Sequence, residues 1–567
     1  MNELPLTPEQ IKSLAIQFRI HKEKEIKKKI EDGEASLFEK ESLNFIDQKK
    51  REEQEIKDKV KLEYLGLISA KNPDYPQASE VLVNYIKSKL IIYTTKEDEK
   101  SEVWIYKDGI YVPQGRSEIK YLLRDVLEAH YTIFIFNLVM AKIEPDTFIE
   151  SATFFSSENI DEIPVLNGIL NIHTLELTPH TPKKIFFNKL PVTYDPTAKC
   201  QKIERFLRDV LSKEEDIDLF YEIAGTALLK EYKFEKAAMF VGSGRNGKGK
   251  SILLLKMLFG IDNCCSVPLS ALNPDSFSIF ELFGKMLNLA GDIGSQDLKD
   301  TSMFKSLTGR DLVAGKRKFL NNVNFVNYAK FVFACNDLPM VYDLSKGFWD
   351  RWLLLEFPYT FVTQEEFNQT PKKDRKLLKI KDEEIIDKIT TPEEMSGFLN
   401  ESLVALARVL KRRRFSATAG SEEVKSKWIR MSNSFMAFCY DCLKEDYEGK
   451  ISKKELRKRY ADYCKTHKIA GKSDFVIKRV LQEMFGASEE RTKVGDFDST
   501  YEWSWLGIGW KNKRVIRFAS RKQSKSKDCK EIYPYRRASD LLYRCKTPCS
   551  LDIQEEKLDT GKGVDNV

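Results

Sequence analysis

The sequence VGSGRNGKGKSILLLKMLFG occupies residues 241–260 and sets the architecture expected for its surroundings. It joins the end of an apolar run to a glycine-rich turn and then to an apolar segment of helical length. Glycines let backbone N–H groups turn toward a phosphate, a lysine balances its charge, and a helix N-terminus adds partial positive charge. The pattern therefore predicts a loop that binds the phosphates of a nucleotide.

The spacing G-x-x-x-x-G-K-[ST] fits this stretch in two registers. The first register begins at Gly242 and places Lys248 on the phosphates, whereas the second begins at Gly244 and places Lys250 there. The strand-like run AAMFV (237–241) leads directly into Gly242, as the strand before such a loop should, so we favour the first register. The residues expected to line the nucleotide are Gly242, Ser243, Gly244, Arg245, Asn246, Gly247, Lys248, Gly249 and Lys250.

Magnesium ligation is unusual in the favoured register. Gly249 occupies the Ser/Thr position and has no hydroxyl group to place on Mg²⁺. Ser251 lies about 200° further round the helix, at roughly 100° per residue. We therefore expect Mg²⁺ to be held through water or by an acidic residue elsewhere.

Three polar residues lie next to apolar runs downstream of the loop: two follow such a run and the third precedes one. KMLNLAGDIG contains Asp292, a carboxylate that can hold Mg²⁺ or polarise the attacking water. FVFACNDLP contains Asn336, whose amide can orient that water, and GFWDRW presents Arg351, whose guanidinium can stabilise charge on a transferring phosphoryl group. Each residue alone is as often structural, but their order behind the loop predicts a nucleotide hydrolase.

The segment FKSLTGRDLVAGKRKFLNNVNF (304–325) has strand-like pieces on either side of a basic turn. It predicts a hairpin with a basic tip, and a solvated hairpin without a ligand is the alternative. In a ring-shaped motor, such a tip can grip DNA phosphates. The basic residues that flank the turn are Lys305, Lys316, Arg317 and Lys318.

Five of these segments resemble the motifs of superfamily III helicases. GSGRNGK, LAGDIG, FKSLTGRDLVAGKRK, FVFACNDLP and GFWDRW are similar to motifs A, B, B-prime, C and the arginine finger of that family. Gly260 also falls where the family closes the helix after its phosphate loop. Residues 80–510 resemble the helicase half of phage, plasmid and viral primase-helicases, including the poxvirus-type NTPase-helicases.

The resemblance implies a DNA-unwinding ring, with six copies of the chain, that uses ATP and Mg²⁺. It implies that Lys248 binds phosphate, that Asp292 serves the metal and the water, and that Asn336 senses the γ-phosphate. It also implies that Arg351 reaches the ATP of a neighbouring subunit.

The same resemblance implies that Lys316 and Lys318 contact DNA. The chain departs from the family pattern at two positions. Gly249 replaces the usual Ser/Thr, and Ile293 follows Asp292 where a second acid is usual. These departures bear on the metal and on the group that activates water.

The region after residue 420 has helical patterns followed by aromatic, strand-like runs, which is typical of a winged helix. The family carries a similar domain there. A packing domain with a charged face is the alternative to DNA binding, and Trp503, Trp505 and Trp510 are assigned to core and wing packing. The candidate DNA contacts are Lys453, Lys454, Arg457 and Lys478.

The expected fold class is α/β, with an AAA+-like P-loop core between an α+β N-terminal domain and a C-terminal winged helix. Five regions follow from composition and pattern. They are a charged helical or partly disordered arm (1–75), the small α+β domain (76–190), a helical lead-in and core (191–415), the winged-helix-like domain (421–515), and a basic flexible tail (516–567).

Composition is that of a globular protein of 567 residues, 42% of which are hydrophobic. The net charge is +7, and basic residues are concentrated between residues 511 and 546, which suits a phosphate backbone, although a solvated tail is the alternative. Ten scattered cysteines indicate a reducing compartment, and the apolar run from Tyr131 is too short to cross a bilayer. We expect the cytoplasm, or the replication site in a host cell if the protein is viral.

These features together predict a replicative DNA helicase of a mobile element or virus. Two other functions remain open: an ATP-switched origin-binding initiator and a DNA-packaging ATPase. A primase centre would need a catalytic carboxylate pair, and the D-x-D of VGDFDST has no nearby histidine. Priming is therefore expected to reside in a separate chain or a missing N-terminal part.

Overall fold

The computed structural model divides the chain into two units, Met1–Lys511 and Asn512–Val567, and every described residue lies in the first. Three site residues expected above, Asp292, Arg317 and Lys318, lie outside the described residues, as does the expected tail from residue 516. The structure describes residues 37–96, 101–156, 159–274, 276–291, 298, 300–316, 323–341, 343, 345–416, 420–432, 434–467, 471–494 and 500–511.

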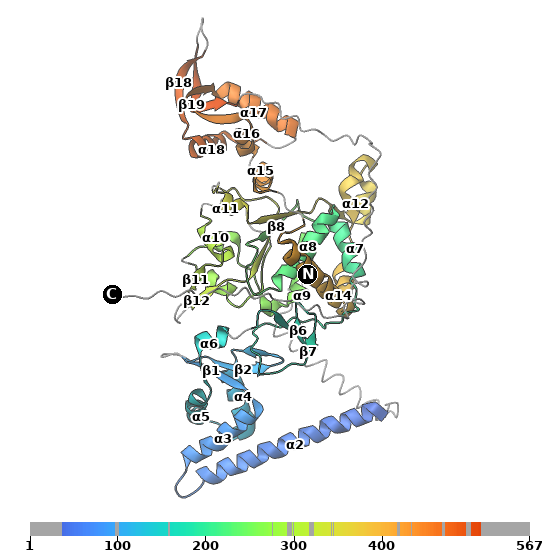
Figure 1. The fold of residues 1–567 in the computed structure, drawn as a ribbon, viewed down its shortest axis with the longest axis vertical. Coiled ribbons are helices and arrows are strands. Elements are labelled where there is room, and N and C mark those ends of the chain that lie inside the picture. Colours follow the sequence, from blue (N-terminus) through green and yellow to red (C-terminus); the bar gives the residue numbers. More distant parts are fainter. Residues whose placement is uncertain are drawn as a thin grey trace, which may run out of the picture. The chain divides into compact units, whose positions relative to one another are not determined.

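A five-stranded, all-parallel sheet forms the centre of the first unit (Figure 1). Its strands lie in the order β14-β8-β13-β10-β9, so β8 pairs with two strands that come much later in the chain. Buried side chains fill most strand positions, as parallel sheets covered on both faces require. The strands are β8 (Ala237–Val241), β9 (Cys264–Cys265), β10 (Leu287–Ala290), β13 (Lys330–Cys335) and β14 (Trp352–Glu356).

One face of this sheet is covered by four helices. Ala238 and Phe240 of β8 point to this face and pack with the apolar sides of the helices. The helix that begins at Lys248 belongs to this layer, which holds it against the strand from which its loop emerges. The four helices are α7 (Gln201–Val210), α8 (Glu214–Ala227), α9 (Lys248–Phe259) and α14 (Pro392–Arg412).

The opposite face is covered by shorter helices and by aromatic side chains. Met239 of β8 points to this face, where Trp352 stacks on Phe304 with ring centroids 4.8 Å apart. Trp428 is fully buried here and donates from Nε1 to the carbonyl oxygen of Pro339, at 2.8 Å. The helices are α10 (Ser302–Thr308), α11 (Lys346–Trp349) and α15 (Ser421–Ser432). A mixed α/β fold is thus confirmed for the described residues.

A segment after the sheet passes over the glycine-rich turn. The amide of Phe361 donates to the carbonyl oxygen of Arg245 at 2.6 Å, which ties the segment to the turn. The segment contains β15 (Thr360–Val362), α12 (Gln364–Gln369), β16 (Leu378–Ile380) and α13 (Ile385–Ile389), with β15 and β16 paired in parallel.

The N-terminal part combines a four-stranded sheet, of order β3-β2-β1-β4, with helices that share one apolar cluster. Its elements are α3 (Tyr75–Lys89), β1 (Ile92–Lys96), β2 (Val103–Lys107), β3 (Ile110–Val112), α4 (Gly115–Leu127), α5 (Ile133–Asp146), β4 (Phe148–Glu150) and α6 (Ser151–Ser156). A second sheet follows, made of β5 (Glu162–Val165), β6 (Gly168–Asn171) and β7 (Leu177–Thr178). The apolar run from Tyr131 forms α5, and no helix among the described residues is long and apolar enough to cross a membrane.

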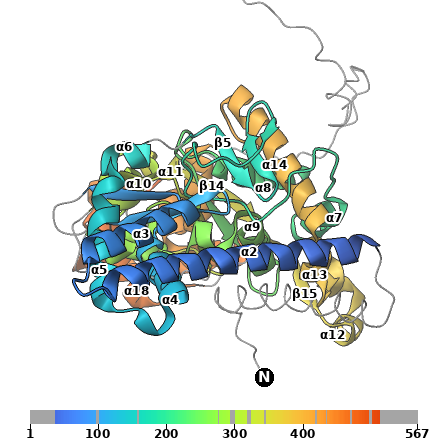
Figure 2. The same cartoon turned by 90° about the horizontal axis from the view of Figure 1, so that it is seen from below.

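A long helix, α2 (Leu37–Ile68), precedes this part, and its end lies beside α3 (Figure 2). Residues 48–56 are exposed all round, but Tyr64 is buried in the same cluster as α3 and α4. Lys57 and Lys61 form ion pairs with Asp125 and Glu128 at the end of α4. The expected arm of residues 1–75 therefore contributes its last turns to the packed N-terminal part.

The C-terminal part of the first unit has the element order helix, strand, helix, helix, hairpin. Its three strands form an antiparallel sheet of order β17-β19-β18 around a cluster that includes Trp505 and Ile508. The elements are α16 (Ser434–Cys442), β17 (Leu443–Ser452), α17 (Lys453–His467), α18 (Asp474–Phe485), β18 (Ser488–Val494) and β19 (Thr500–Trp510).

A buried lysine opens β13 and gives the core a pH-dependent stability. The ammonium of Lys330 donates to the carbonyl oxygens of Tyr328, at 2.8 Å, and Leu229, and lies 5.4 Å from the ring centre of Tyr232. Burial lowers the pKa of Lys330 to about 7, from an ordinary value of 10.5. Between these values the unfolded chain binds one more proton than the folded chain, so this group makes the unfolding free energy rise with pH.

We expect the unfolding free energy of the wild type, minus that of Lys330→Met, to rise between pH 7.5 and 9. The slope should approach about 1.4 kcal/mol per pH unit. Urea unfolding at several pH values measures both proteins, and taking the difference cancels the cysteines and tyrosines that also titrate in this range. Parallel curves for the two proteins would show that Lys330 stays charged when folded.

Candidate functional site

The glycine-rich turn after β8 has a backbone that only glycine adopts without strain at two of its positions. Gly244 and Gly247 have φ values of +94° and +89°. A side chain at Gly247 would also place its Cβ 2.4 Å from Cγ1 of Val210, at the end of α7. The turn is therefore shaped both by its own residues and by the helix that packs on it.

Lys248 begins α9 and extends back across the turn to the strand ends. Its ammonium donates to the carbonyl oxygen of Gly242 and to Oδ1 of Asn336, the latter at 2.8 Å. The sheet register brings these partners together, because Cys335 of β13 lies opposite Val241 of β8. Lys248 is 5% exposed, so its charge is directed into the site.

The neighbouring positions on α9 differ from Lys248. Lys250 is exposed, and a side chain at Gly249 would meet nothing within 4 Å. Ser251 is fully buried, and its hydroxyl donates to the carbonyl oxygen of Gly247 at 3.1 Å. Of the two lysines weighed for the phosphates, Lys248 is the one whose ammonium donates to Asn336.

Magnesium ligation is not supported by the residues described around the turn. Gly249 has no side-chain oxygen to bind a metal ion, and the hydroxyl of Ser251 already donates a hydrogen bond to the backbone. Over the described ranges, no group of three His, Cys, Asp or Glu side chains lies close enough to hold a metal ion. Asp292 follows β10 and remains a predicted ligand, outside the described residues.

Arg245 lies at the exposed edge of the turn and pairs with Glu366 of α12 at 3.1 Å. Glu366 also accepts from the amide of Thr363, in the capping box that begins α12. Two hydrogen bonds lower the pKa of the Glu366 carboxyl: the one from Arg245 has the larger effect and the one from Thr363 the smaller. An anionic ligand at the turn would compete with Glu366 for the Arg245 guanidinium.

Arg351 lies at the opposite ends of the strands from the glycine-rich turn. Its carbonyl oxygen accepts from Ala237, the first residue of β8, whereas the turn follows the last residue of β8. The length of β8 separates the two edges by about 13 Å, at roughly 3.3 Å per residue. The guanidinium donates to Thr308 Oγ1 at 2.8 Å, to Glu235 at 3.2 Å and to the carbonyl oxygen of Gly347. Arg351 is therefore far from the turn of its own chain.

The expected hairpin is present as β11 (Leu312–Gly315) paired with β12 (Val323–Val326). Gly315 lies opposite Val323, the last pair of the described ladder. Lys316 is half-buried just after β11, and Arg317 and Lys318 lie outside the described residues. Lys305 is not on the hairpin; it lies on α10, where it forms an ion pair with Asp343 at 2.9 Å.

Three of the four candidate DNA contacts in the C-terminal part have acidic partners. Lys453 and Lys478 both pair with Glu489, at 2.7 Å and 3.3 Å. Arg457 pairs with Asp474 at 2.6 Å, and Lys454 is exposed at the start of α17. Glu489 thus holds the N-terminus of α17 and the middle of α18 to the first strand of the hairpin.

The tryptophans of β19 divide into two environments. Trp505 is 3% exposed in the core, and Trp510 packs on Phe438 and lies 4.0 Å from the Arg459 guanidinium, both as expected. Trp503 does not fit the expected packing role, because 55% of its surface is exposed. Trp503 and Trp505 share one face of β19, but the helices cover this face only at Trp505.

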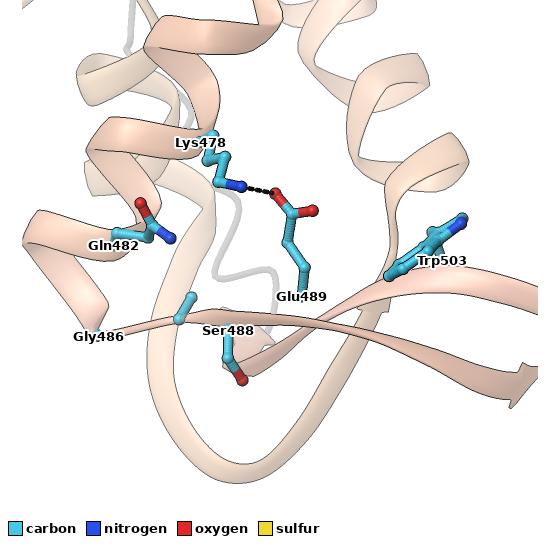
Figure 3. Close-up of a pocket in the computed structure, with 7 residues that line it drawn as sticks. Lys478, Gln482, Gly486, Ser488, Glu489 and Trp503 are labelled. Carbon is cyan, nitrogen blue, oxygen red and sulfur yellow. Dashed lines mark ion pairs between the residues drawn. The ribbon is translucent and has the colours of Figure 1, made fainter.

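Trp503 borders a surface hollow of about 660 Å³ between α18 and the hairpin (Figure 3). Lys478 and Gln482 project from the helix, and the ion pair between Lys478 and Glu489 spans the hollow. The indole ring lies on the strand side, with the ammonium of Lys453 5.4 Å from its centre. An exposed aromatic ring beside several lysines is the combination that binds bases and phosphates together.

Two family models match parts of the chain. One is described as a family of unknown function (DUF5906) and matches residues 240–351, which contain the turn, Asn336 and Arg351. The other is described as D5 N terminal like and matches residues 82–212. The two matches thus cover the N-terminal part and most of the sheet.

A curated relative gives the functional comparison. V13 of the Sputnik virophage, a protein named as a helicase, is 26% identical over 212 residues. The match covers 36% of this chain and 26% of V13, so the chain spans about a quarter of the length of this relative. The similarity is to a viral helicase.

Solved structures are more distant. The apo C-terminal region of NrS-1 (305–718) is 12% identical, with a TM-score of 0.38 over 76% of this chain and 98% of that chain. A JCV helicase bound to a small molecule is 15% identical, with a TM-score of 0.17 over 46% of this chain and 71% of that chain. TM-scores this low do not establish a shared fold.

The site contains partners that sequence patterns did not reveal. Glu235, Thr308 and Glu366 each hold one of the arginines discussed above, and Asp343 holds Lys305. A single acidic or hydroxyl residue belongs to no periodic pattern that would distinguish it from a solvated one. The one available signal was Asp343 two residues before Ser345, a spacing typical of a side chain that caps its own turn.

Proposed function

We propose that this chain is an ATP-dependent DNA helicase of the superfamily III type, acting in replication. The observation that carries the proposal is the position of Lys248, whose ammonium lies between Gly242 and Asn336 at the carboxyl edge of a parallel sheet. This edge is where open α/β sheets bind ligands, and a lysine there meets phosphates. The similarity to a viral helicase supports the same interpretation.

ATP, when bound, supplies the γ-phosphoryl group that is transferred to water. The amides of the turn and the N-terminus of α9 bind the phosphates. The Lys248 ammonium then exchanges its bonds to Gly242 and Asn336 for bonds to phosphate oxygens, because a cation is attracted more strongly to an anionic oxygen than to a neutral amide oxygen. This exchange frees Oδ1 of Asn336 to accept from the attacking water and hold it in line.

A ring of six copies completes the proposed site. Arg351 lies about one strand length from its own turn, at the opposite edge of the sheet, and this position supports action on the ATP of a neighbour. In that role, its guanidinium would stabilise charge on the transferring phosphoryl group. The ring would act in the cytoplasm or at a viral replication site, with priming supplied by a separate chain.

DNA is the proposed partner at two surfaces. Lys316, Arg317 and Lys318 lie between β11 and β12 in the sequence, and Arg317 and Lys318 stay predicted contacts outside the described residues. The C-terminal part has the order helix, strand, helix, helix, hairpin, which supports a winged helix, and it exposes Lys454 and Trp503. The exposed indole supports contact with an unpaired base, which a forked substrate provides.

The test is ATP hydrolysis and strand separation by the purified full chain. We expect single-stranded DNA to raise hydrolysis about fivefold or more, and we expect a forked duplex to be unwound only with hydrolysable ATP. Electron microscopy with ATP and forked DNA should show six-membered rings. DNA-stimulated hydrolysis that never separates a fork would contradict the helicase proposal. Slow turnover with tight, ATP-dependent duplex binding would instead favour the origin-binding initiator.

A further inference from the structure

Helix α10 leads directly into the hairpin, and one carboxylate holds its first turn. Oδ2 of Asp343 accepts from Nζ of Lys305 at 2.9 Å and from the hydroxyl of Thr301, while Oδ1 accepts from the amide of Ser345 at 2.8 Å. Asp343 is largely buried, with 15% of its side chain exposed. The carboxylate therefore joins α10 to the loop that follows β13.

That loop begins at Asn336, the residue that contacts Lys248. Between Asn336 and Asp343, the side chains of Leu338 and Val341 are buried in the core, 2% and 3% exposed. The amide of Leu298 donates to the carbonyl oxygen of Met340 at 2.8 Å, which pins the middle of the loop. A shift at the end of β13 would therefore move this packed loop and, with it, Asp343.

The other end of α10 is joined to the hairpin and to Arg351. Asn327, just after β12, is 1% exposed and donates to the carbonyl oxygen of Leu307 in the last turn of α10. Thr308 accepts from Nε of Arg351. β11 therefore begins just after α10, and β12 ends beside the last turn of α10. The same helix contacts Asp343, in the loop that carries Asn336, and Arg351.

We propose that Asp343 is a positioning residue that couples the nucleotide site to the DNA-contacting hairpin through α10. The inference rests on the proposed function and deepens it. In the structure, Lys305 serves this coupling as the ionic partner of Asp343, in place of the DNA contact expected from the sequence. Loss of either partner would leave the ATP site intact and disconnect it from the hairpin.

The state of the carboxyl group agrees with this role. Burial raises the pKa of Asp343, but hydrogen bonds from Ser345, Thr301 and Lys305 outweigh it and hold the pKa well below its ordinary value. Asp343 is therefore charged throughout the pH range in which the enzyme would be assayed, and the link is constant rather than pH-gated.

The experiment measures the ratio of ATP hydrolysis with and without single-stranded DNA. For Asp343→Asn we expect hydrolysis without DNA within about twofold of wild type, and we expect the DNA-stimulation ratio to fall from about fivefold or more to about 1. DNA affinity should be unchanged, because the hairpin tip is intact. Lys305→Gln should lower the ratio equally, the double variant should lower it no further, and Asp343→Glu should restore part of it.

Glu162→Gln is the matched control. Glu162 pairs with Lys184 in the N-terminal part, with side-chain exposures of 12% and 39%, against 15% and 35% for Asp343 and Lys305. This variant should keep the wild-type ratio. If it loses stimulation equally, the effect is general destabilisation and the inference is wrong.

Two other results would also overturn the inference. A wild-type ratio in Asp343→Asn would show that the contact does not couple the nucleotide site to the hairpin. Weaker DNA binding by Lys305→Gln alone would show that Lys305 contacts DNA, as the sequence predicted. Wild-type protein without DNA-stimulated hydrolysis would instead contradict the proposed function itself. Thermal unfolding of each variant separates these results from misfolding, and if Asp343→Asn fails to fold, Lys305→Gln alone decides between them.

Discussion

Replacing Lys248 by alanine should lower ATP hydrolysis by on the order of 10²–10³-fold, the usual effect of removing one positioned electrostatic donor. The side chain is almost fully buried and directed at the strand ends, where the phosphates are expected. Binding of a fluorescent ATP analogue and steady-state hydrolysis measure the effect. Both should fall, because a lysine at this position contributes to binding as well as to turnover.

Lys250→Ala is the matched control for this prediction. It removes the same side chain two residues later in the same helix, where the lysine is exposed. We expect hydrolysis within about threefold of wild type, since ionic contacts of an exposed side chain contribute only about 0–1 kcal/mol. If Lys250→Ala alone abolished hydrolysis, the second register of the glycine-rich turn would be the functional one.

Arg351→Ala should lower hydrolysis by about 10³–10⁵-fold if the arginine acts as a finger on a neighbouring site. Nucleotide binding should persist, because the turn of the same chain is untouched. The decisive measurement mixes two inactive proteins, Arg351→Ala and Lys248→Ala. In mixed rings, an intact turn from the first meets an intact arginine from the second, and hydrolysis should reappear.

A double variant, Lys248→Ala with Arg351→Ala, provides the control for mixing. Mixed with either single variant, it supplies no complete site, so hydrolysis should stay absent. The alternative is a structural arginine that only holds Glu235, Gly347 and Thr308. In that case Arg351→Ala should lose thermal stability, and mixing should restore nothing.

Local features of the site could be predicted from the sequence. The strand, turn and helix around Gly242 were predictable because glycine spacing and apolar periodicity are properties of neighbouring residues. The hairpin of residues 312–326 was predictable for the same reason. Asp292, Arg317 and Lys318 stay predictions, since they lie outside the described residues.

Contacts between distant segments were not predictable. Asp343 and Lys305 are 38 residues apart, and nothing in either sequence context identifies the other as its partner. Trp503 and Trp505 are two residues apart and lie on the same face of β19, so alternation along the strand cannot tell them apart. The extent of helix cover makes one ring exposed and the other buried. The end of α2 likewise reads as a charged helix, although Tyr64 places it in a core.

The order of the central sheet also governs how the chain can fold during synthesis. β8 has both its partners, β13 and β14, roughly 90 and 115 residues further along the chain. At about 5–20 residues per second, a ribosome needs roughly 5–25 s to deliver them. Until β13 has been made, the apolar strand AAMFV has two unpaired edges, and unpaired edges can pair with strands of other nascent chains. A chain released before β13 would contain every residue of the glycine-rich turn and still lack both the strand that pairs with β8 and the Asn336 that Lys248 contacts.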